Sequence, residues 1–591
     1  MKTFISKYIK KGGLCIAMVL PLTCGLTACS DEHMAEVNTD DSKSAVINPN
    51  SLLTTGLLQT YGDFNLMDTY RSYITGFTQH FAGGWNVTNY AGSVHADDDQ
   101  MRLIWDKYYA VAIKNLVDAI NNSEDKPNIN AALRIHRVYL MSVLTDTYGE
   151  LPCKQAGLAY IKGITTPEYE SQEDIYNFFF DELAACANQL ATGTDLIGGD
   201  VTSLSGDAAA WRKYANSLRL RFAMRISGVN PTKAQQEFEK ALADEGGYIQ
   251  SAADDAYIIY TDGPFTLYEG SRDLDFRVNA LGEILYGQDP TSPTFVCSTF
   301  FNIMNDSNDP RLYRICRHYL NTKRAETKPD REWNVDVTDE VVAYIKKIGD
   351  VEQPNNPGAA WYNDWVNAPA NSDIPTLDKL VKLYPDAGFD GSNFPARMMR
   401  PFLSIDFEMP DRPGALINSA EVEFLLAEAK LNGWNVTGTV EDHFNAGVKA
   451  SMQWLNTHYL QADKKISDAE INTFVASQAA ALTANAKEAI NTQAWILHMM
   501  NPAEAWANLR RSDYPVLMDR TKLAKFEKDF TYDDVNLQTP TRLRYPILEN
   551  DYNSKNYNAA IERIGTLNDK GKYVDDWHHR LWWDVADINV K

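Results

Sequence analysis

The chain has 591 residues, 44% of them hydrophobic, which is enough apolar material for a large folded body. It carries 56 Lys and Arg against 79 Asp and Glu, and removing the four lysines of its N-terminal leader leaves 52 against 79, a net charge of −27. This charge would repel phosphate groups, so the composition argues against a nucleic-acid-binding protein. It also disfavours an anionic polymer as the ligand.

The N-terminus has the features of a secretory leader that ends in a lipid-attachment motif. Four lysines and no acid precede an apolar run over 14–22, which is too short to span a bilayer. A branched apolar residue and two small residues, Leu26-Thr27-Ala28, then precede Cys29. We therefore expect residues 1–28 to be a signal peptide and Cys29 to become the acylated first residue. An ordinary secretion signal is the alternative.

Acyl chains on Cys29 would hold the protein at a membrane without a spanning helix, because each buried CH₂ group contributes about 0.8 kcal/mol. The acidic run Ser30-Asp31-Glu32 resembles an export signal of bacterial lipoproteins that face outward from the outer membrane. Residues 29–50 are polar and lack an apolar period, which predicts a flexible tether. The expected location is the extracellular side of the outer membrane.

Four cysteines remain beyond the leader and Cys29. Cys153, Cys186, Cys297 and Cys316 are widely spaced and form no CxxC pair. This pattern indicates neither a disulfide framework nor a zinc site. We expect them to be small core residues.

Apolar residues recur at helical spacing over most of the chain. A stripe over 105–120 predicts a first helix, and a second is expected to begin at Asn130 and to end before Gly149 and Pro152. Further stripes cover 175–190, 211–226, 422–429, 444–455 and 490–509. Antiparallel helix pairs of this kind cannot bury their faces alone, so the sequence predicts a mostly α fold of stacked helical hairpins. The tetratricopeptide consensus itself is absent.

The helical period fades between residues 257 and 413, where proline, glycine, asparagine and aromatic residues dominate. We interpret 257–413 as a loop-rich subdomain inserted between two helical regions, 51–256 and 414–591. Long loops on a rigid frame commonly carry binding sites.

Seven sequence blocks stand out in chain order: 144–152 (LTDTYGELP), 211–225 (WRKYANSLRLRFAMR), 308–312 (NDPRL), 420–433 (AEVEFLLAEAKLNG), 493–515 (QAWILHMMNPAEAWANLRRSDYP), 544–546 (RYP) and 581–584 (LWWD). Together they resemble the SusD/RagB family of outer-membrane lipoproteins, over nearly the whole mature chain. The resemblance implies a body of tetratricopeptide-like helix pairs at the cell surface. It also implies a nutrient-binding role in partnership with a SusC-like TonB-dependent transporter.

Several of these blocks have a structural interpretation. Glu421 and Glu428 lie seven residues apart on one helix face, and Arg510 and Arg511 are natural partners for buried acids of this kind. The block at 308–312 is expected to form a turn in which Asp309 hydrogen-bonds local backbone.

No catalytic signature is present: the chain lacks GxSxG, HExxH, GxxxxGK[ST] and GxGxxG motifs. We therefore predict a binding protein rather than an enzyme, without a cofactor or metal. The expected ligand is an oligo- or polysaccharide. Three alternatives stay open: a peptide-binding RagB-like lipoprotein, a surface glycoside hydrolase, which needs only two carboxylates, and a protein-interaction scaffold.

The ligand site is expected on aromatic loops at two places. The stretch Gly83–Tyr90 combines two glycines with aromatics and amides ahead of the first predicted helix. Within it, and within the inserted region that the family resemblance points to, the candidate ligand-binding residues are Trp85, Asn86, Asn89, Tyr90, Arg272, Trp361, Tyr362 and Trp365. A pyranose can cover an indole with its C–H face while its hydroxyls bond planar amides or a guanidinium. Alternatively, each aromatic packs its loop onto the body.

Overall fold

The computed structural model describes residues 48–261, 277–286, 294–317, 319–321, 334–336, 402–518 and 538–586. The chain divides into two compact units, 1–47 and 48–591, and every described residue belongs to the second. None of the described helices combines the length and apolar character that crossing a membrane requires. The expected signal peptide, Cys29 and most of the tether lie outside the described residues.

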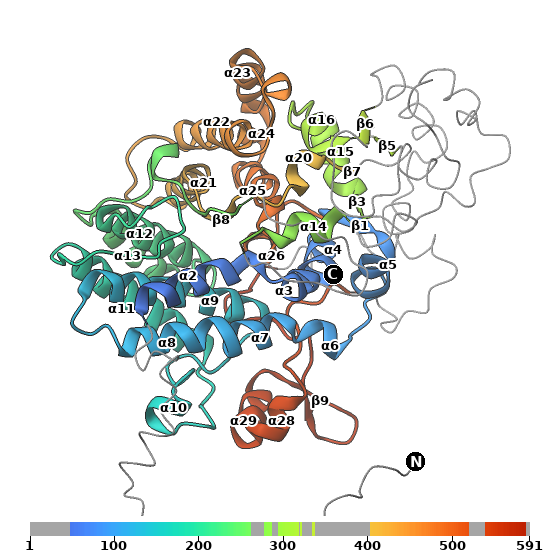
Figure 1. Cartoon of the computed structure of the whole chain (residues 1–591). Coiled ribbons are helices and arrows are strands. Elements are labelled where there is room, and N and C mark those ends of the chain that lie inside the picture. Colours follow the sequence, from blue (N-terminus) through green and yellow to red (C-terminus); the bar gives the residue numbers. More distant parts are fainter. Residues whose placement is uncertain are drawn as a thin grey trace, which may run out of the picture. The chain divides into compact units, whose positions relative to one another are not determined.

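The N-terminal half is built from antiparallel helices, as the apolar stripes predict (Figure 1). The long helices are α8 (Lys114–Asn121), α9 (Pro127–Tyr148), α11 (Gln172–Leu190), α12 (Ala208–Arg225) and α13 (Pro231–Leu242). Successive members contact each other, and α9 also contacts α2 (Pro49–Gly62) and α26 (Pro502–Ser512). Almost every residue of α9 is buried, so this helix forms the centre of the N-terminal core.

The predicted stripe over 105–120 is helical but not one regular α-helix. It comprises α7 (Leu103–Lys107), the π-helical turn η3 (Tyr108–Ile113) and α8. Trp105, Tyr108, Ala112 and Leu116 are buried along it. The π-helical turn widens the period locally while the buried face is maintained.

The predicted start of the second helix at Asn130 is wrong. Helix α9 begins at Pro127, and its first N–H groups are capped from a distant loop: the Asp195 carboxylate accepts hydrogen bonds from the backbone of Asn128 (2.8 Å) and Ile129 (3.1 Å). Asn130 instead donates its side-chain amide to the carbonyl of Ile120 (3.0 Å). The predicted end is correct, because Gly149 follows the helix with φ +100°, where a side chain would be strained.

The C-terminal half repeats the plan with α21 (Ser419–Leu431), α22 (Val440–His458), α25 (Ala486–Leu497) and α26. Helix α21 packs on both α22 and α25, and α12 of the N-terminal half packs on α21. Thr439 and Asp442 form a reciprocal capping box at the start of α22. The mostly α fold of stacked helix pairs is therefore confirmed.

Strands are short and pair only two at a time in the described part of the chain, always antiparallel. Strand β2 (Ala256–Ile258) pairs with β8 (Gly414–Ile417), so the two ends of the predicted insertion lie side by side. The other pairs are β1 (Phe81–Gly83) with β3 (Thr294–Val296), β4 (Cys316–Arg317) with β7 (Phe402–Leu403), β5 (Tyr319–Asn321) with β6 (Asn334–Asp336), and β9 (Thr566–Leu567) with β10 (Tyr573–Val574). The domain boundaries at 257 and 413 stay a prediction.

Buried ion pairs join the helices. Arg511 binds Glu428 through both guanidinium nitrogens at 2.7 Å, as predicted. Glu421 has a different partner from the one expected: it pairs with Arg221 of α12, while Arg510 donates to the backbone carbonyls of Thr541 and Asp146. Sequence spacing could not distinguish these partners, since the arginines come from separate helices.

The expected turn at 308–312 is also present. The Asp309 carboxylate accepts from the backbone N–H of Arg311 at 2.9 Å and pairs with the guanidinium of the same residue. Both side chains are fully buried.

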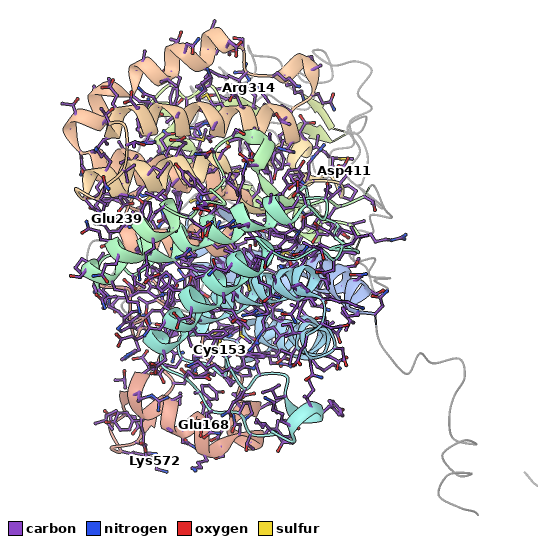
Figure 2. The ribbon with its side chains drawn as sticks, turned by 90° about the vertical axis from the view of Figure 1, so that its left-hand side faces the viewer. Cys153, Glu168, Glu239, Arg314, Asp411 and Lys572 are labelled. Atoms are coloured by element: carbon purple, nitrogen blue, oxygen red, sulfur yellow. The ribbon has the colours of Figure 1, made fainter. Side chains whose placement is uncertain are left out.

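The four cysteines are buried, as predicted, and none of them forms a disulfide. Burial raises the pKa of the Cys153 thiol, labelled in Figure 2, to about 12. This thiol is therefore a core group rather than a nucleophile.

The last described elements are α28 (Leu548–Tyr552), α29 (Ser554–Ile564) and the β9–β10 hairpin. They attach to the loop after α9: Tyr169 donates to the Glu549 carboxylate at 2.7 Å, and Asn553 donates to the carbonyl of Pro167 at 2.7 Å. Glu168 of that loop and Lys572 of the hairpin accordingly lie at the same end of the view in Figure 2.

Candidate functional site

The predicted early loop starts from a two-stranded ribbon. Strand β1 pairs with β3 in the register Phe81↔Val296 and Gly83↔Thr294. The chain then enters the short helix α5 (Gly84–Val87) and the π-helical turn η2 (Thr88–Gly92). Because β3 belongs to the 257–413 segment, the ribbon joins the early loop to a described strand of that segment.

Helical spacing within α5 and η2 decides which side chains face the core. Val87, Tyr90 and Ala91 are buried, while Asn86 and Asn89 are half-buried. The buried residues are three or four positions apart and anchor one face. The two amides lie on the other side of the turns, where each retains exposed surface.

Tyr90 packs against two other aromatic rings. Its ring centroid lies 5.5 Å from that of Tyr73 and 6.0 Å from that of His95, and only 7% of the residue is exposed. The Tyr73 hydroxyl donates to the carbonyl of His95 (2.9 Å) and accepts from the N–H of Asp97 (2.9 Å). Tyr73 thus fixes the chain that follows η2, and Tyr90 packs the loop onto the body.

The base of the loop is tied to two remote segments by Gln79. Its Nε2 donates to the carbonyl of Met518 (2.8 Å), and its Oε1 accepts from the N–H of Met518 (3.1 Å) and from the Thr299 hydroxyl. Gln79 is 1% exposed and has φ +54°. The side chain of Gln79, two residues before β1, therefore joins three parts of the chain.

His80 adds a second tie. Its ring stacks on Trp495 at 4.4 Å between centroids, and its Nε2 donates to the Trp495 carbonyl at 2.9 Å. Trp495 Nε1 donates in return to the carbonyl of Thr78 at 3.0 Å. Burial lowers the pKa of His80 to about 3, so the imidazole is neutral and serves packing rather than proton transfer.

The predicted site residues are described to different extents. Trp85 is the second residue of α5, and only its backbone is described. Arg272, Trp361, Tyr362 and Trp365 lie outside the described residues. Their roles stay predictions. Gln79, His80 and Thr299 were not predicted; the polar run at 78–80 next to the glycine-rich loop was the available signal.

One group of described side chains has the composition of a metal site. Ligand atoms of Glu421, His498 and Glu504 all lie within 4.8 Å of one another and are buried. Two guanidinium groups already engage these acids: Arg221 Nε lies 2.5 Å from Glu421, and Arg225 Nη2 lies 2.5 Å from Glu504.

The charges of this cluster disfavour a cation. Burial by itself would raise the pKa of Glu504, but Arg225 and Arg221 lower it to about 2. Each carboxylate is matched by an arginine, and a divalent ion would have to displace a buried positive charge. We interpret the cluster as a charge-paired core.

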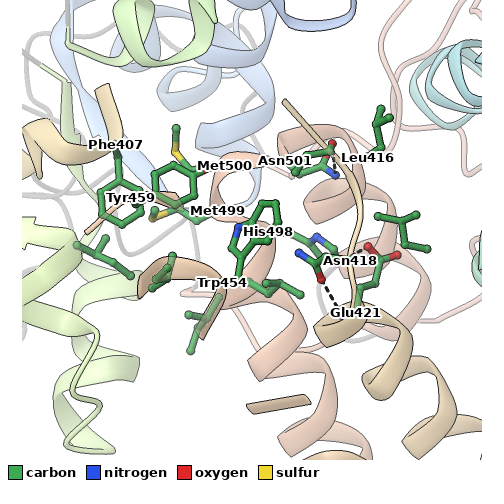
Figure 3. A pocket seen from close by; sticks show the side chains of 16 residues that line it. Phe407, Leu416, Asn418, Glu421, Trp454, Tyr459, His498, Met499, Met500 and Asn501 are labelled. Carbon is green, nitrogen blue, oxygen red and sulfur yellow. Dashed lines mark hydrogen bonds and ion pairs between the residues drawn. The ribbon is translucent and has the colours of Figure 1, made fainter. Parts of the chain in front are cut away.

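A small cavity beside this cluster is shown in Figure 3, lined by Asn418, Glu421, Trp454, His498 and Asn501 among others. Its volume is about 20 Å³. This is enough for one water molecule and far too little for a sugar ring. The cavity is therefore not the ligand site.

Comparison with known proteins identifies the family. One family model, described as starch-binding associating with outer membrane, matches residues 41–334, and a second, described as SusD and RagB outer membrane lipoprotein, matches 391–584. The chain belongs to the SusD/RagB family. The resemblance carried by the seven sequence blocks is thereby confirmed. A comparison with proteins of curated function returns no match.

Solved structures resemble the chain over nearly its whole length. The Bacteroidetes AC2a SusD-like protein is 37% identical, with a TM-score of 0.76 over 91% of this chain and 100% of that one. A structure titled chitin-binding protein is 28% identical, with a TM-score of 0.69 over 91% and 100%. A SusD homolog from Bacteroides uniformis, 22% identical with a TM-score of 0.63 over 92% and 100%, shares the fold.

Proposed function

We propose that this SusD/RagB chain is a lipid-anchored receptor that faces outward from the outer membrane, binds an oligo- or polysaccharide and delivers it to a SusC-like TonB-dependent transporter. Two family models whose descriptions name starch binding and outer-membrane lipoproteins support the proposal. The similarity to a structure titled chitin-binding protein supports a saccharide ligand.

One observation carries the proposed position of the site: β1, which leads into Trp85, pairs with β3 of the 257–413 segment. A clamp built from both regions requires this contact. In the proposed clamp Trp85 stacks on a sugar ring, and the half-buried amides of Asn86 and Asn89 bond its hydroxyls. The other half comprises Arg272, Trp361, Tyr362 and Trp365.

A glycan panel that includes starch and chitin oligosaccharides tests the function. We expect the purified protein to retain at least one glycan without shortening it. Released shorter products would indicate a hydrolase instead. Retention of peptides alone would indicate a RagB-like peptide receptor, and capture of proteins alone a scaffold.

Replacing Trp85 or Trp361 with Ala, one at a time, tests the clamp. A shallow site that binds with millimolar affinity has only about 4 kcal/mol of binding free energy, so loss of one stacking ring should abolish detectable binding. Removing a Trp that packs in the core would instead cost about 3 to 5 kcal/mol of stability. Glycan affinity and thermal unfolding should be measured for both variants.

Tyr160→Ala is the control, because Tyr160 is 93% exposed on α10 (Ala159–Lys162), which lies apart from the β1–β3 ribbon in Figure 1. Lost binding with unchanged unfolding in the Trp variants, and no change in the control, is the expected result. Lowered unfolding temperature with unaltered binding would rule the clamp out.

The anchor and the partner need separate tests. Cys29→Ala should release the protein from the membrane fraction, and protease added to intact cells should digest the wild-type protein. Gentle detergent extraction should copurify a large barrel protein. Membrane retention of Cys29→Ala would contradict the acyl anchor, and absence of the barrel would contradict the transporter partnership.

A further inference from the structure

We propose that the chain has a second, smaller ligand site, which takes a single neutral sugar ring. It is a cavity of about 280 Å³ formed where α9 ends, α11 begins and α29 ends, closed by the C-terminal segment 579–582. Its lining includes Glu150, Gln172, Glu173, Arg563, His579 and Trp582. The cavity shares no residue with the loop at 81–95. Its assignment to a sugar, rather than to another small polar molecule, rests on the proposed function.

The polar groups of the wall are held in place before any ligand arrives. Gln172 Nε2 donates to the carbonyl of Thr145 at 2.9 Å, and its Oε1 accepts from the N–H of Trp582 at 2.8 Å. The Glu150 carboxylate accepts from Arg563 Nε at 2.6 Å. Fixed polar groups lower the ordering cost of binding, which matters most for a small ligand.

The same wall offers an apolar surface. The half-buried indole of Trp582 lies 6.3 Å from the ring of Tyr176. Ile564 and Leu581 complete the apolar part of the wall. An indole beside amide and carboxylate groups suits a pyranose, whose C–H face is apolar and whose hydroxyls need planar acceptors and donors.

The charge and the size of the cavity restrict the class of ligand further. Each guanidinium of the wall already has a carboxylate partner: Arg542 pairs with Asp575, Arg563 with Glu150, and Arg580 with Asp584. No surplus positive charge remains to favour an anion. Ligand pockets for drug-sized molecules begin at about 300 Å³, so this cavity fits one sugar ring rather than a chain.

Fluorine NMR of protein labelled with 5-fluorotryptophan can follow the two sites separately. The chain has 13 Trp residues, and the variants Trp582→Phe and Trp85→Phe assign the two reporter signals. The probes are glucose, galactose, mannose, xylose and N-acetylglucosamine, followed by the oligosaccharides of the glycan panel. We expect at least one monosaccharide to shift the Trp582 signal saturably.

Blocking the cavity provides the mutational test. Glu173 is exposed in the first turn of α11 and lines the cavity, whereas Asp181 is exposed on the same helix and does not. Glu173→Trp should weaken the monosaccharide titration by about tenfold or more, and Asp181→Trp should leave it unchanged. Thermal unfolding of both variants verifies that they fold.

Three results would overturn the second site: a Trp582 signal that no monosaccharide moves in the wild-type protein, an equal titration in Glu173→Trp, or loss of the Trp582 response in Trp85→Ala. The proposed glycan-receptor function fails on a different readout, namely retention of no oligosaccharide of the glycan panel by the purified protein. The two failures are therefore distinguishable.

Discussion

Gln79 should control both the stability of the protein and its affinity for glycan, because it ties down the base of the early loop. Gln79→Ala removes the two hydrogen bonds to the Met518 backbone and the one from the Thr299 hydroxyl. The main chain at residue 79 and the β1–β3 pairing that follows are left in place. The substitution thus tests the tie itself.

The three bonds set the magnitude. A hydrogen bond within a protein contributes about 1 kcal/mol net, and the half-buried backbone of Met518 can regain water as a partner. We therefore expect the free energy of unfolding to fall by about 2 kcal/mol. If half of this, about 1 kcal/mol, holds the loop in its ligand-binding geometry, glycan affinity should fall about fivefold.

Thermal unfolding and glycan titration should be measured for Gln79→Ala beside Gln236→Ala. Gln236 is exposed on α13, and its replacement should change stability by less than about 0.5 kcal/mol. Wild-type unfolding and wild-type affinity in Gln79→Ala would refute the reasoning, since the loop would then be held without this side chain.

Two further predictions concern the helical body. Arg511→Met should cost about 3 to 5 kcal/mol in urea unfolding because it strands the buried Glu428 carboxylate, and adding Glu428→Leu should recover most of the loss. Burial alone would raise the pKa of Glu428, but Arg511 lowers it overall. The ion pair therefore stabilises the folded protein at pH values above the ordinary pKa of Glu. The loss of stability in Arg511→Met should accordingly shrink as the pH falls below that pKa. Asp195→Ala should cost about 1 to 2 kcal/mol by uncapping α9, with Asp195→Asn in between; equal stability of all three proteins would contradict the cap.

The helices were predictable because a helix with one buried face repeats its apolar residues with a period of about 3.6 in the sequence. The start of α9 was not, because its cap is Asp195, which follows Pro127 by more than sixty residues and leaves no local signal. The partner of Glu421 was missed for the same reason, since Arg221 reaches it from the other half of the chain. Contacts between remote segments depend on packing that one sequence does not encode locally.

Only part of the candidate site, too, could be predicted from the sequence. Paired glycines beside aromatics predict an irregular loop at 83–90, whereas the chain there forms the short helix α5 and the π-helical turn η2. The ribbon under it could not be foreseen, because β3 has three residues and no pattern distinguishes Thr294-Phe295-Val296 from other apolar triplets. The tie from Gln79 to Met518 is likewise a contact of two backbone groups with one amide, which no motif describes.

A rigid base is what a shallow carbohydrate site needs. Ordering the backbone of one free residue costs about 1 to 2 kcal/mol, so ordering three or four would consume the roughly 4 kcal/mol of binding free energy available to a millimolar ligand. In this chain folding itself meets that cost at the base of the loop: β1 pairs with β3, Gln79 binds Met518 and His80 stacks on Trp495. Only side chains that keep exposed surface, such as the amides of Asn86 and Asn89, then remain to be ordered by the ligand. Loosening the base should therefore weaken glycan binding even where no ligand-contacting residue is changed.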